Sequence, residues 1–322
     1  MTTVSAGERR KKSLREAYKD ALLSLADVYP DLFVMDADVG SSTRGAWFGR
    51  QYPDRYLNVG AAEQNLVLAA AGMALAGHSV FAAAYSSFLV GRAYEQIRSA
   101  VALPRLPVHL VGSHAGLTVG EDGATHQMLE DLALMRVLPD MTLLVPSDYT
   151  SAFALLREAA ALDGPSYTRL GRSEQAAIYE PGDTGFRIGG GHVLRDGDQL
   201  TLCACGIMVE EALKAAEILD QQDISAEVID CYCLRPFPAR LVSSSLQRTG
   251  CCVTAEEHFL SGGLFETVAG LAAREYPVPV QPVGVRAEFG QSGSAEELKE
   301  YYGLTAAQIV SAAVLAWTMR RR

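Results

Sequence analysis

The sequence lacks a long apolar run and an excess of basic residues, and each absence excludes a class of protein. No uninterrupted apolar run reaches the ~18 to 20 residues that a membrane-spanning helix needs. The polar and basic start, Met1 to Lys12, has no apolar stretch behind it that resembles a signal peptide, so we expect a cytoplasmic protein. Lys and Arg number 28 against 38 Asp and Glu, a net charge of −10, which argues against a general nucleic-acid or membrane-surface binder.

The sequence also lacks the cysteine spacing of a zinc site. Its six cysteines fall as close pairs inside apolar, strand-like runs: Cys203 and Cys205, Cys231 and Cys233, Cys251 and Cys252. Zinc sites usually place two or more residues between paired cysteines, on loops. Alternate residues of a strand face the same side, and a free cysteine behaves as a small buried hydrophobe. We therefore expect core packing, without metal and without disulfides.

A chain of 322 residues is too long for one ordinary core and suits two domains. Apolar runs alternate with segments of helical spacing, which predicts an α/β fold of two doubly wound domains with parallel sheets. The first domain is expected over residues 1–175 and the second, smaller one over 193–322. The predicted strands are 32–35, 56–59, 80–84, 108–112, 142–145, 199–205, 226–231 and 252–255; the predicted helices are 13–28, 66–76, 90–102, 129–135, 150–161, 210–219 and 264–274.

The segment 176–192 breaks this alternation. It contains Pro181 and several glycines, including Gly189-Gly190-Gly191. A phosphate-binding loop is one interpretation of the triplet, but the Lys-Ser/Thr of a P-loop and the strand-to-helix context of a dinucleotide fingerprint are both missing. A linker between the two domains is the favoured interpretation.

The most informative stretch is Gly120-Glu121-Asp122-Gly123-Ala124-Thr125-His126-Gln127. It follows the apolar run Leu106 to Gly112, which reads as a buried parallel strand. The stretch therefore lies at the carboxyl end of a strand, where open α/β sheets bind their ligands. A surface turn would also be rich in Gly and Asp, but it rarely combines them with Thr and His.

Several segments in order resemble the carboxyl-terminal half of the transketolase family of thiamine-diphosphate enzymes. The block Gly120–Gln127 is similar to the family's most specific signature. Gly60-Ala61-Ala62-Glu63-Gln64-Asn65 resembles its Gly-x-x-Glu segment, and Phe88 followed by residues 91–97 resembles the helix after its pyrimidine-stacking aromatic residue. Glu256-Glu257-His258, followed by Gly262-Gly263-Leu264, resembles part of its last domain. The resemblance covers nearly the whole chain, from about Lys12 to about Ala316.

One part of the family pattern is missing. In the family, a separate amino-terminal domain holds the cofactor's diphosphate and Mg²⁺ through Gly-Asp-Gly and a downstream Asn. Here Asp196-Gly197-Asp198 reads only as a polar turn. The resemblance therefore implies one subunit of a split transketolase, whose site is completed by a separate amino-terminal, diphosphate-binding subunit that brings most of the Mg²⁺ contacts. Two such chains and two partners would form an α2β2 heterotetramer.

The resemblance implies roles for the residues that face the cofactor. Glu63 would be the acid that hydrogen-bonds the aminopyrimidine ring, and it opens a very apolar helix, which suits a protonated carboxyl; a solvated Glu at a helix N-terminus is the alternative. Phe88 and Tyr85 would contact the pyrimidine, with core packing as the alternative. Asp38 falls on a family position near the cofactor. Gly91 replaces a frequent aromatic residue and leaves room there.

Other residues would bind the sugar substrates. Asp122 would contact the acceptor's 2-hydroxyl, and His126 would act in catalysis and contact the donor, with a structural His as the alternative. Four more residues land on the family's phosphate-binding positions: Arg15, Ser42, His114 and Arg172. Each alone could be ordinary surface polarity, but all four together indicate a phosphorylated substrate.

The sequence thus predicts a transketolase subunit that transfers a two-carbon ketol unit from a ketose to an aldose and is active only with its partner. A β subunit of a 2-oxoacid dehydrogenase shares this architecture but would lack the Glu-Asp-Gly-x-Thr-His block. A non-catalytic scaffold subunit would have no use for a buried acid at position 63. A transketolase specialised for an unusual sugar in a biosynthetic pathway is a further alternative.

Overall fold

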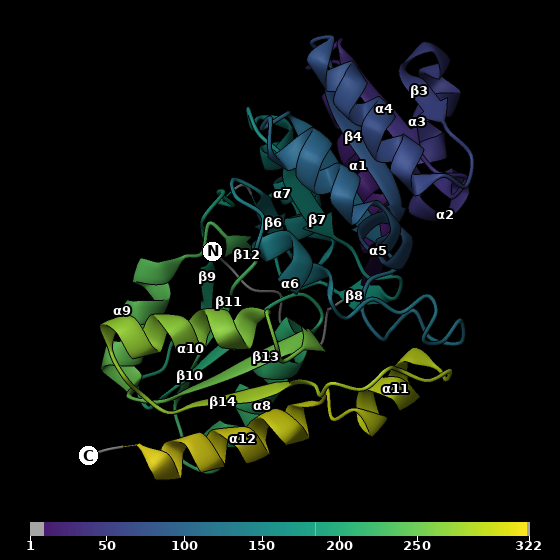
Figure 1. Ribbon diagram of the computed structural model, residues 1–322. Helices are drawn as coiled ribbons and strands as arrows, with labels where there is room; N and C mark the ends of the chain where they lie inside the picture. The colour runs from purple at the N-terminus through teal and green to yellow at the C-terminus, as the bar shows by residue number, and fades with distance from the viewer. Residues whose placement is uncertain (1–9, 184, 321–322) are drawn as a thin grey trace.

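The computed structural model describes residues 10–183 and 185–320, which form two adjoining α/β domains, each built on its own sheet (Figure 1). The first sheet has the order β12-β6-β7-β5-β4-β2-β3. All of its neighbouring strands are parallel except β12, which runs antiparallel to β6. Its strands are β2 (Leu32–Asp36), β3 (Tyr56–Asn58), β4 (Ser79–Tyr85), β5 (Val108–Ser113), β6 (Thr142–Leu144), β7 (Ser166–Arg169) and β12 (Cys233–Arg235).

Helices cover both faces of this sheet. On one face α1 (Leu14–Leu25) and α7 (Tyr149–Ala160) pack with Phe81 and Ala83 of β4. On the other face α4 (Glu63–Leu75) and α5 (Ser86–Gln96) pack with Val80, Ala82 and Ala84. Alternate residues of one strand thus serve opposite faces, as the pleat requires. The predicted doubly wound arrangement is confirmed.

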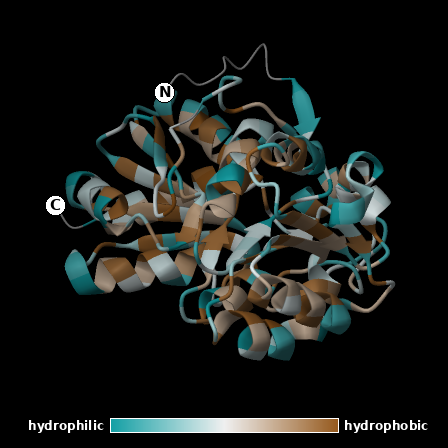
Figure 2. Cartoon of the chain, turned by 90° about the horizontal axis from the view of Figure 1, so that it is seen from above, coloured by the Kyte–Doolittle hydropathy of each residue, from teal (hydrophilic) through white to brown (hydrophobic). Residues whose placement is uncertain are grey.

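The second sheet has the order β14-β13-β10-β11-β9, parallel except for the edge strand β9. Helices α8 and α12 cover one face with Leu202, whereas α9 and α10 cover the other with Cys203. The elements are β9 (His192–Arg195), β10 (Leu200–Ala204), β11 (Ala226–Asp230), β13 (Cys252–Phe259), β14 (Val280–Val285), α8 (Met208–Asp220), α9 (Ala239–Thr249), α10 (Leu264–Glu275), α11 (Ala295–Tyr301) and α12 (Ala306–Met319). In Figure 2 the hydrophobic segments gather on the strands in the middle of the molecule.

Several features differ from the sequence-based expectation, which also lacked β7, β9, β14, α9, α11 and α12. The strands β1 (Lys11–Ser13) and β8 (Glu174–Ala176) form an antiparallel pair that precedes the expected linker. The helix expected over 90–102 begins at Ser86, and its last part, Ile97–Ala102, is a π-helix. Strand β12 comes from the second half of the chain but joins the first sheet. These strands are too short to show an apolar pattern.

All six cysteines are buried and free, as the core-packing interpretation predicts. Cys203 and Cys252 lie on the neighbouring strands β10 and β13, with their sulfur atoms 3.9 Å apart. Cys203, Cys205, Cys231 and Cys252 belong to one apolar cluster. They fill the core as small hydrophobes.

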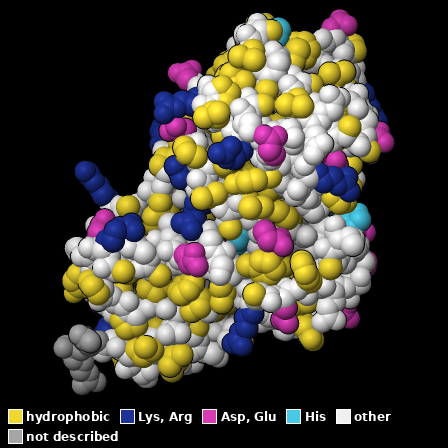
Figure 3. Space-filling model, viewed as in Figure 1, with side chains coloured by type: hydrophobic (Ala, Val, Ile, Leu, Met, Phe, Trp, Pro, Cys, Tyr) yellow, Lys and Arg dark blue, Asp and Glu magenta, His cyan; other side chains and the backbone are white. Residues whose placement is uncertain are grey.

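One described stretch, Ala295–Met319, is long and apolar enough by composition to cross a membrane. The structure divides it into α11 and α12, separated by a turn. Ile309, Ala312 and Ala313 of α12 are buried in the second core, and a core helix meets the same criterion. The outer side of α12 exposes Val314 and Leu315, and hydrophobic side chains are frequent on the face of this domain seen in Figure 3.

Candidate active site

The expected site residues lie at the carboxyl ends of the parallel strands of the first sheet. Tyr85 ends β4, and Phe88 lies in the first turn of α5. His114 follows β5, Arg172 follows β7, and Glu63 opens α4 after β3. Because these strands are parallel, their carboxyl ends meet at one edge of the sheet. Residues far apart in the sequence are therefore brought together.

Glu63 is buried, with 5% of its surface exposed, and forms an ion pair with Arg92 of α5. Arg92 Nη1 lies 3.1 Å from Glu63 Oε2 and 3.4 Å from Oε1. The same guanidinium lies over the ring of Phe88, 4.0 Å from its centroid. A carboxylate, a cation and an aromatic face therefore stack in a row between α4 and α5.

Aromatic rings and imidazoles continue this row. His126 meets Phe88 edge-on at a centroid distance of 5.1 Å and Tyr85 at 6.4 Å. Tyr85 lies against His114 at 4.0 Å. His126 Nδ1 is 3.0 Å from the Thr125 hydroxyl, and His114 Nδ1 is 2.7 Å from that of Ser113. Each imidazole thus has one nitrogen held by a neighbouring hydroxyl, which orients the ring.

The far end of the row is cationic. Arg15 donates from Nη1 to the Ser42 carbonyl at 3.0 Å and from Nη2 to the Arg172 carbonyl at 3.3 Å. Arg172 Nη1 lies 3.5 Å from Asp122 Oδ2. Burial lowers the pKa of His114 to about 3, and the charges of Arg15 and Arg172 act in the same direction. His114 is therefore neutral at neutral pH beside two cations, in a group suited to a bound anion.

Asp38 lies apart from this row. Its backbone N–H and its Oδ1 atom both hydrogen-bond the side chain of Asn58, in the turn that follows β2. Asp38 adopts a positive φ of 64°, a conformation that Asp tolerates better than most residues. The structure thus joins Asp38 to β3 but shows no contact with Glu63 or Phe88.

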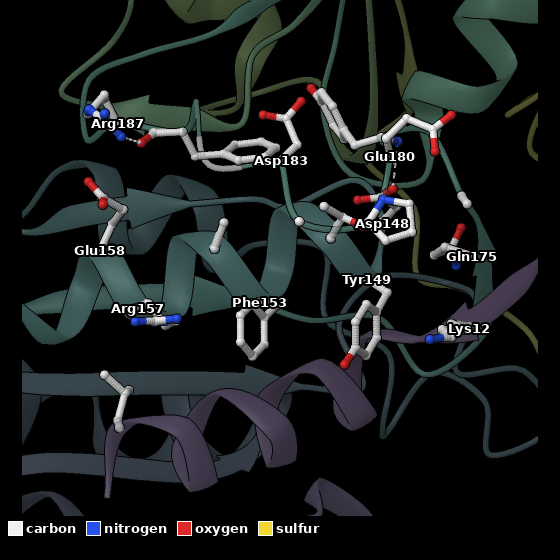
Figure 4. A pocket seen from close by; sticks show the side chains of 18 of the residues that line it. Lys12, Asp148, Tyr149, Phe153, Arg157, Glu158, Gln175, Glu180, Asp183 and Arg187 are labelled. Atoms are coloured by element: carbon white, nitrogen blue, oxygen red, sulfur yellow. Dashed lines mark hydrogen bonds between the residues drawn. The ribbon is translucent and has the colours of Figure 1, made fainter. Parts of the chain in front are cut away.

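A cavity of about 820 Å³ lies elsewhere, between α7 and the segment after β8. Figure 4 shows Tyr149, Phe153 and Arg157 of α7 on one side and Asp183 and Arg187 on the other. None of the expected site residues lines this cavity. Its acidic and basic side chains are mixed, and no row of catalytic groups converges on it. The chemistry is therefore assigned to the strand ends.

Comparison with known protein families shows which family this chain belongs to. Residues 10–176 match the family domain described as transketolase, pyrimidine binding domain, and residues 189–309 match the transketolase C-terminal domain. The chain belongs to the transketolase family. This confirms the resemblance found in the sequence.

Individual relatives, two of similar length and one about twice as long, are named as transketolases or transketolase-like proteins. The chain is 42% identical over 295 residues to a putative transketolase C-terminal section of Methanocaldococcus jannaschii, covering 91% of this chain and 92% of the relative. It is 39% identical over 300 residues to a 6-deoxy-6-sulfo-D-fructose transketolase subunit, SqwH, of Clostridium sp., covering 93% of each. It is 35% identical to human transketolase-like protein 2, of which it spans 49%.

Solved structures agree. A structure described as a split gene transketolase, inactive beta4 tetramer, superposes with a TM-score of 0.88 at 42% identity, covering 96% of this chain and 99% of that one. The transketolase of Campylobacter jejuni superposes at a TM-score of 0.79 and 22% identity over 46% of its own length, which supports the fold alone. The family match favours transketolase over a 2-oxoacid dehydrogenase subunit.

Transketolases depend on thiamine diphosphate, and the residues present suit its pyrimidine end. Glu63 offers a buried carboxylate, and Phe88 offers a flat face. At Gly91, a side chain would meet no atom within 4 Å, so the space that the sequence predicted there is open. A ring stacked on the Arg92 side of Phe88 would displace the guanidinium from that face; the Arg92 side chain is 55% exposed.

Sequence reasoning missed the role of Arg92. Arg92 lies within residues 91–97, which resemble the family's helix, but the sequence does not indicate its role because its partner Glu63 is 29 positions away. The signal that could have found it is the pairing of an acid at the start of one helix with a base in the first turns of the next. Arg44, whose charge acts on Arg15, was missed in the same way.

Proposed function

We propose that this chain is the pyrimidine-binding and C-terminal subunit of a two-component transketolase, which transfers a two-carbon ketol unit from a ketose to an aldose. The observation that carries this proposal is the row of contacts from Glu63 through Arg92, Phe88, His126 and Tyr85 to His114, whose pKa is lowered by the nearby charges of Arg15 and Arg172. It places a buried acid, an aromatic platform, two imidazoles and an anion-binding end in one line. When bound, thiamine diphosphate supplies the nucleophilic carbon that accepts the two-carbon unit.

Each residue of the row has a task in this proposal. Glu63 holds the pyrimidine by a hydrogen bond from a buried carboxyl, and Phe88 supports the flat ring. His126 lies on the same loop as Asp122 and contacts the rings of Phe88 and Tyr85, where it can exchange protons with substrate hydroxyls. Asp122 binds a sugar hydroxyl.

The cationic end would bind the terminal anionic group of the sugar. Arg15, Arg172 and His114 offer donors to a tetrahedral oxyanion, and Ser42 lies next to Arg15. We propose a sugar phosphate as substrate. A sulfonate, as the name of the Clostridium relative indicates for that enzyme, is also a tetrahedral anionic group, though with a single negative charge, and is an alternative.

The partner subunit and the metal also belong to the proposal. Among the residues that the structure describes, no group of three or more His, Cys, Asp or Glu is placed to hold a metal ion. The segment 196–198 lies in the short connection between β9 and β10, with a bend at 198–199. We propose that a separate diphosphate-binding chain holds Mg²⁺, and that two copies of each chain form the active heterotetramer.

Reconstitution tests the proposal. Alone, the chain should show no ketol transfer with thiamine diphosphate and Mg²⁺, and activity should appear on adding a subunit that carries the Gly-Asp-Gly motif. Glu63→Gln should assemble normally but lose activity by at least ~100-fold, as for removal of other catalytic proton-transfer groups. Glu95→Gln, an exposed acid on α5, is the matched control. Turnover by the isolated chain would refute the split site.

A further inference from the structure

The loop that carries Asp122 and His126 is closed at its base by a backbone bridge. Gly116 N–H donates to the Met128 carbonyl at 2.8 Å, and Met128 N–H donates back to Gly116 at 3.4 Å. The residues between them contain the signature stretch. Because both ends of the loop meet at this bridge, whatever fixes the bridge also sets the position of Asp122 and His126.

A carboxylate from the second domain reaches this base. Glu257 of β13 is 3% exposed, and its Oε1 accepts a hydrogen bond from the Thr118 backbone N–H at 2.7 Å. Its carboxylate packs so closely on Gly116 that a Cβ atom there would lie 2.2 Å from it. Gly116 also has a positive φ of 84°, so glycine is required at this position on two grounds.

A buried arginine fixes the other side of the bridge. Arg169 at the end of β7 donates from Nη2 to the Met128 carbonyl at 3.1 Å and to the Glu257 carbonyl at 2.9 Å. Its Nη1 lies 3.9 Å from Glu257 Oε2, and its Nε bonds the carboxylate of Asp131 at 2.9 Å. The two ends of the loop are therefore held between the carboxylate of Glu257 and the guanidinium of Arg169, which come from different sheets.

The second domain also touches the tip of the loop. Gln127 Nε2 donates to the Gln291 carbonyl at 2.9 Å. A Cβ atom at Gly123 would lie 2.5 Å from Ser292 Oγ, and one at Gly120 would lie 3.4 Å from the Gly293 carbonyl. Both glycines have positive φ angles. The loop thus contacts the second domain at several positions along its length.

We propose that Glu257 is a positioning residue, through which the C-terminal domain sets the geometry of the loop that carries Asp122 and His126. Its effect on catalysis rests on the proposed transketolase function, whereas its effect on the loop does not. Glu257 lies beneath the loop, and none of its recorded contacts is with His126, Phe88 or Glu63. It would act on substrate only through the backbone that it holds.

The neighbouring Glu256 provides a matched control. It is equally buried on the same strand, but its carboxylate points to the other side and accepts hydrogen bonds from the backbone of Leu264 and Phe265 at the start of α10. It makes no recorded hydrogen bond to the loop. Glu256→Gln therefore alters a buried acid on β13 without altering the loop base.

Hydrogen exchange of the isolated chain tests the proposal without a partner. Peptides covering 116–128 should exchange about tenfold faster in Glu257→Gln, which keeps an acceptor for Thr118 but loses the charge facing Arg169, and faster still in Glu257→Ala. Glu256→Gln should leave these peptides as in the wild type. Wild-type exchange in both Glu257 variants, or equal acceleration in Glu256→Gln, would overturn the proposal; circular dichroism shows which variants are folded.

Kinetics of the reconstituted enzyme then test the consequence. In Glu257→Gln, kcat should fall by ~10- to 100-fold while the KM for thiamine diphosphate stays unchanged, because the pyrimidine contacts lie on other elements. Wild-type kcat together with a loosened loop would show that Glu257 does not position the catalytic groups. A wild-type complex without ketol transfer would refute the proposed function and leave the exchange result standing.

Discussion

Arg92 links the acid and the aromatic face of the site through one guanidinium. It bonds both carboxylate oxygens of Glu63 and covers Phe88. Without it, a carboxylate that is only 6% exposed would lose its cationic partner. The ion pair therefore holds α4 and α5 together at the point where the cofactor is proposed to bind.

A double-mutant cycle measures this link. Arg92→Ala should lower the free energy of unfolding of the isolated chain by roughly 1–3 kcal/mol, because a buried acceptor is left without its donor. In the Glu63→Gln background the same change should cost less, with a coupling of about 1 kcal/mol. Urea denaturation followed by circular dichroism gives all four values. Additive effects would mean that the pair contributes nothing to stability.

The phosphate site that we propose at the cationic end of the row would separate substrates by their charge. Arg172→Ala should raise the KM for a phosphorylated sugar by ~10- to 100-fold, since a charge-assisted hydrogen bond to the phosphate is lost. The KM for the corresponding unphosphorylated sugar should change little. Steady-state kinetics of the reconstituted enzyme measure both, with the exposed Arg98→Ala as the control. Equal effects on the two sugars would remove Arg172 from phosphate recognition.

Among the elements, the strands β2, β4, β5, β10 and β11 could be predicted from sequence because each contains an apolar run. Strand β7, in the middle of the first sheet, could not, because its sequence is Ser-Tyr-Thr-Arg. The edge strands β9 and β12 could not be predicted either, since three or four residues are too few to show an apolar pattern. The site residues, too, divide into those that the sequence predicted and those that it did not. Residues inside motifs, such as Glu63 and His126, were found from the family resemblance, whereas Arg92 and Glu257 depend on helix and domain packing that sequence spacing does not encode.

The end of strand β11 carries a buried acid that ties the two halves of the chain together. Asp230 Oδ2 accepts hydrogen bonds from Ser147 at 2.7 Å and from Tyr179 at 2.8 Å. Burial raises the pKa of Asp230 from its ordinary value of 3.8 to about 7, against the opposing effect of these two donors. The folded protein thus keeps a proton in a range where the unfolded chain has lost it.

This proton retention predicts the direction of a pH effect. Between pH 3.8 and about 7 the folded state binds more protons at Asp230, so this residue's contribution to the free energy of unfolding falls as pH rises. Asp230→Asn should remove that contribution and flatten the dependence relative to the wild type. Urea denaturation across this pH window measures the difference, with the exposed Asp196→Asn as control. Parallel curves for wild type and Asp230→Asn would contradict it.

At the scale of the whole molecule, the two domains share their interior. Strand β12 pairs with β6 of the other domain. One apolar cluster contains Leu66 and Leu143 of the first domain together with Ile229 and Val242 of the second. A boundary crossed by a strand pair and by a common core favours cooperative unfolding of both domains.

The two tryptophans allow this cooperativity to be measured. Trp47 lies on α3 (Gly45–Gln51) of the first domain, and Trp317 lies on α12 of the second. The variants Trp47→Phe and Trp317→Phe each leave one fluorescent reporter. We expect their denaturation midpoints to coincide after correction for the stability of each variant, as measured by circular dichroism. Two separate transitions within one variant would show that the domains unfold independently.

Because β12 comes from the second half of the chain but pairs in the first sheet, recombination between relatives should be restricted. A chimera that takes residues up to the linker from one relative and the remainder from another would bring together a β6 edge and a β12 strand that had been selected with different neighbours. Such hybrids should tolerate crossovers poorly at the apparent domain boundary. A chimera in which β12 is transplanted together with the first half would keep the β6–β12 strand pair from one relative.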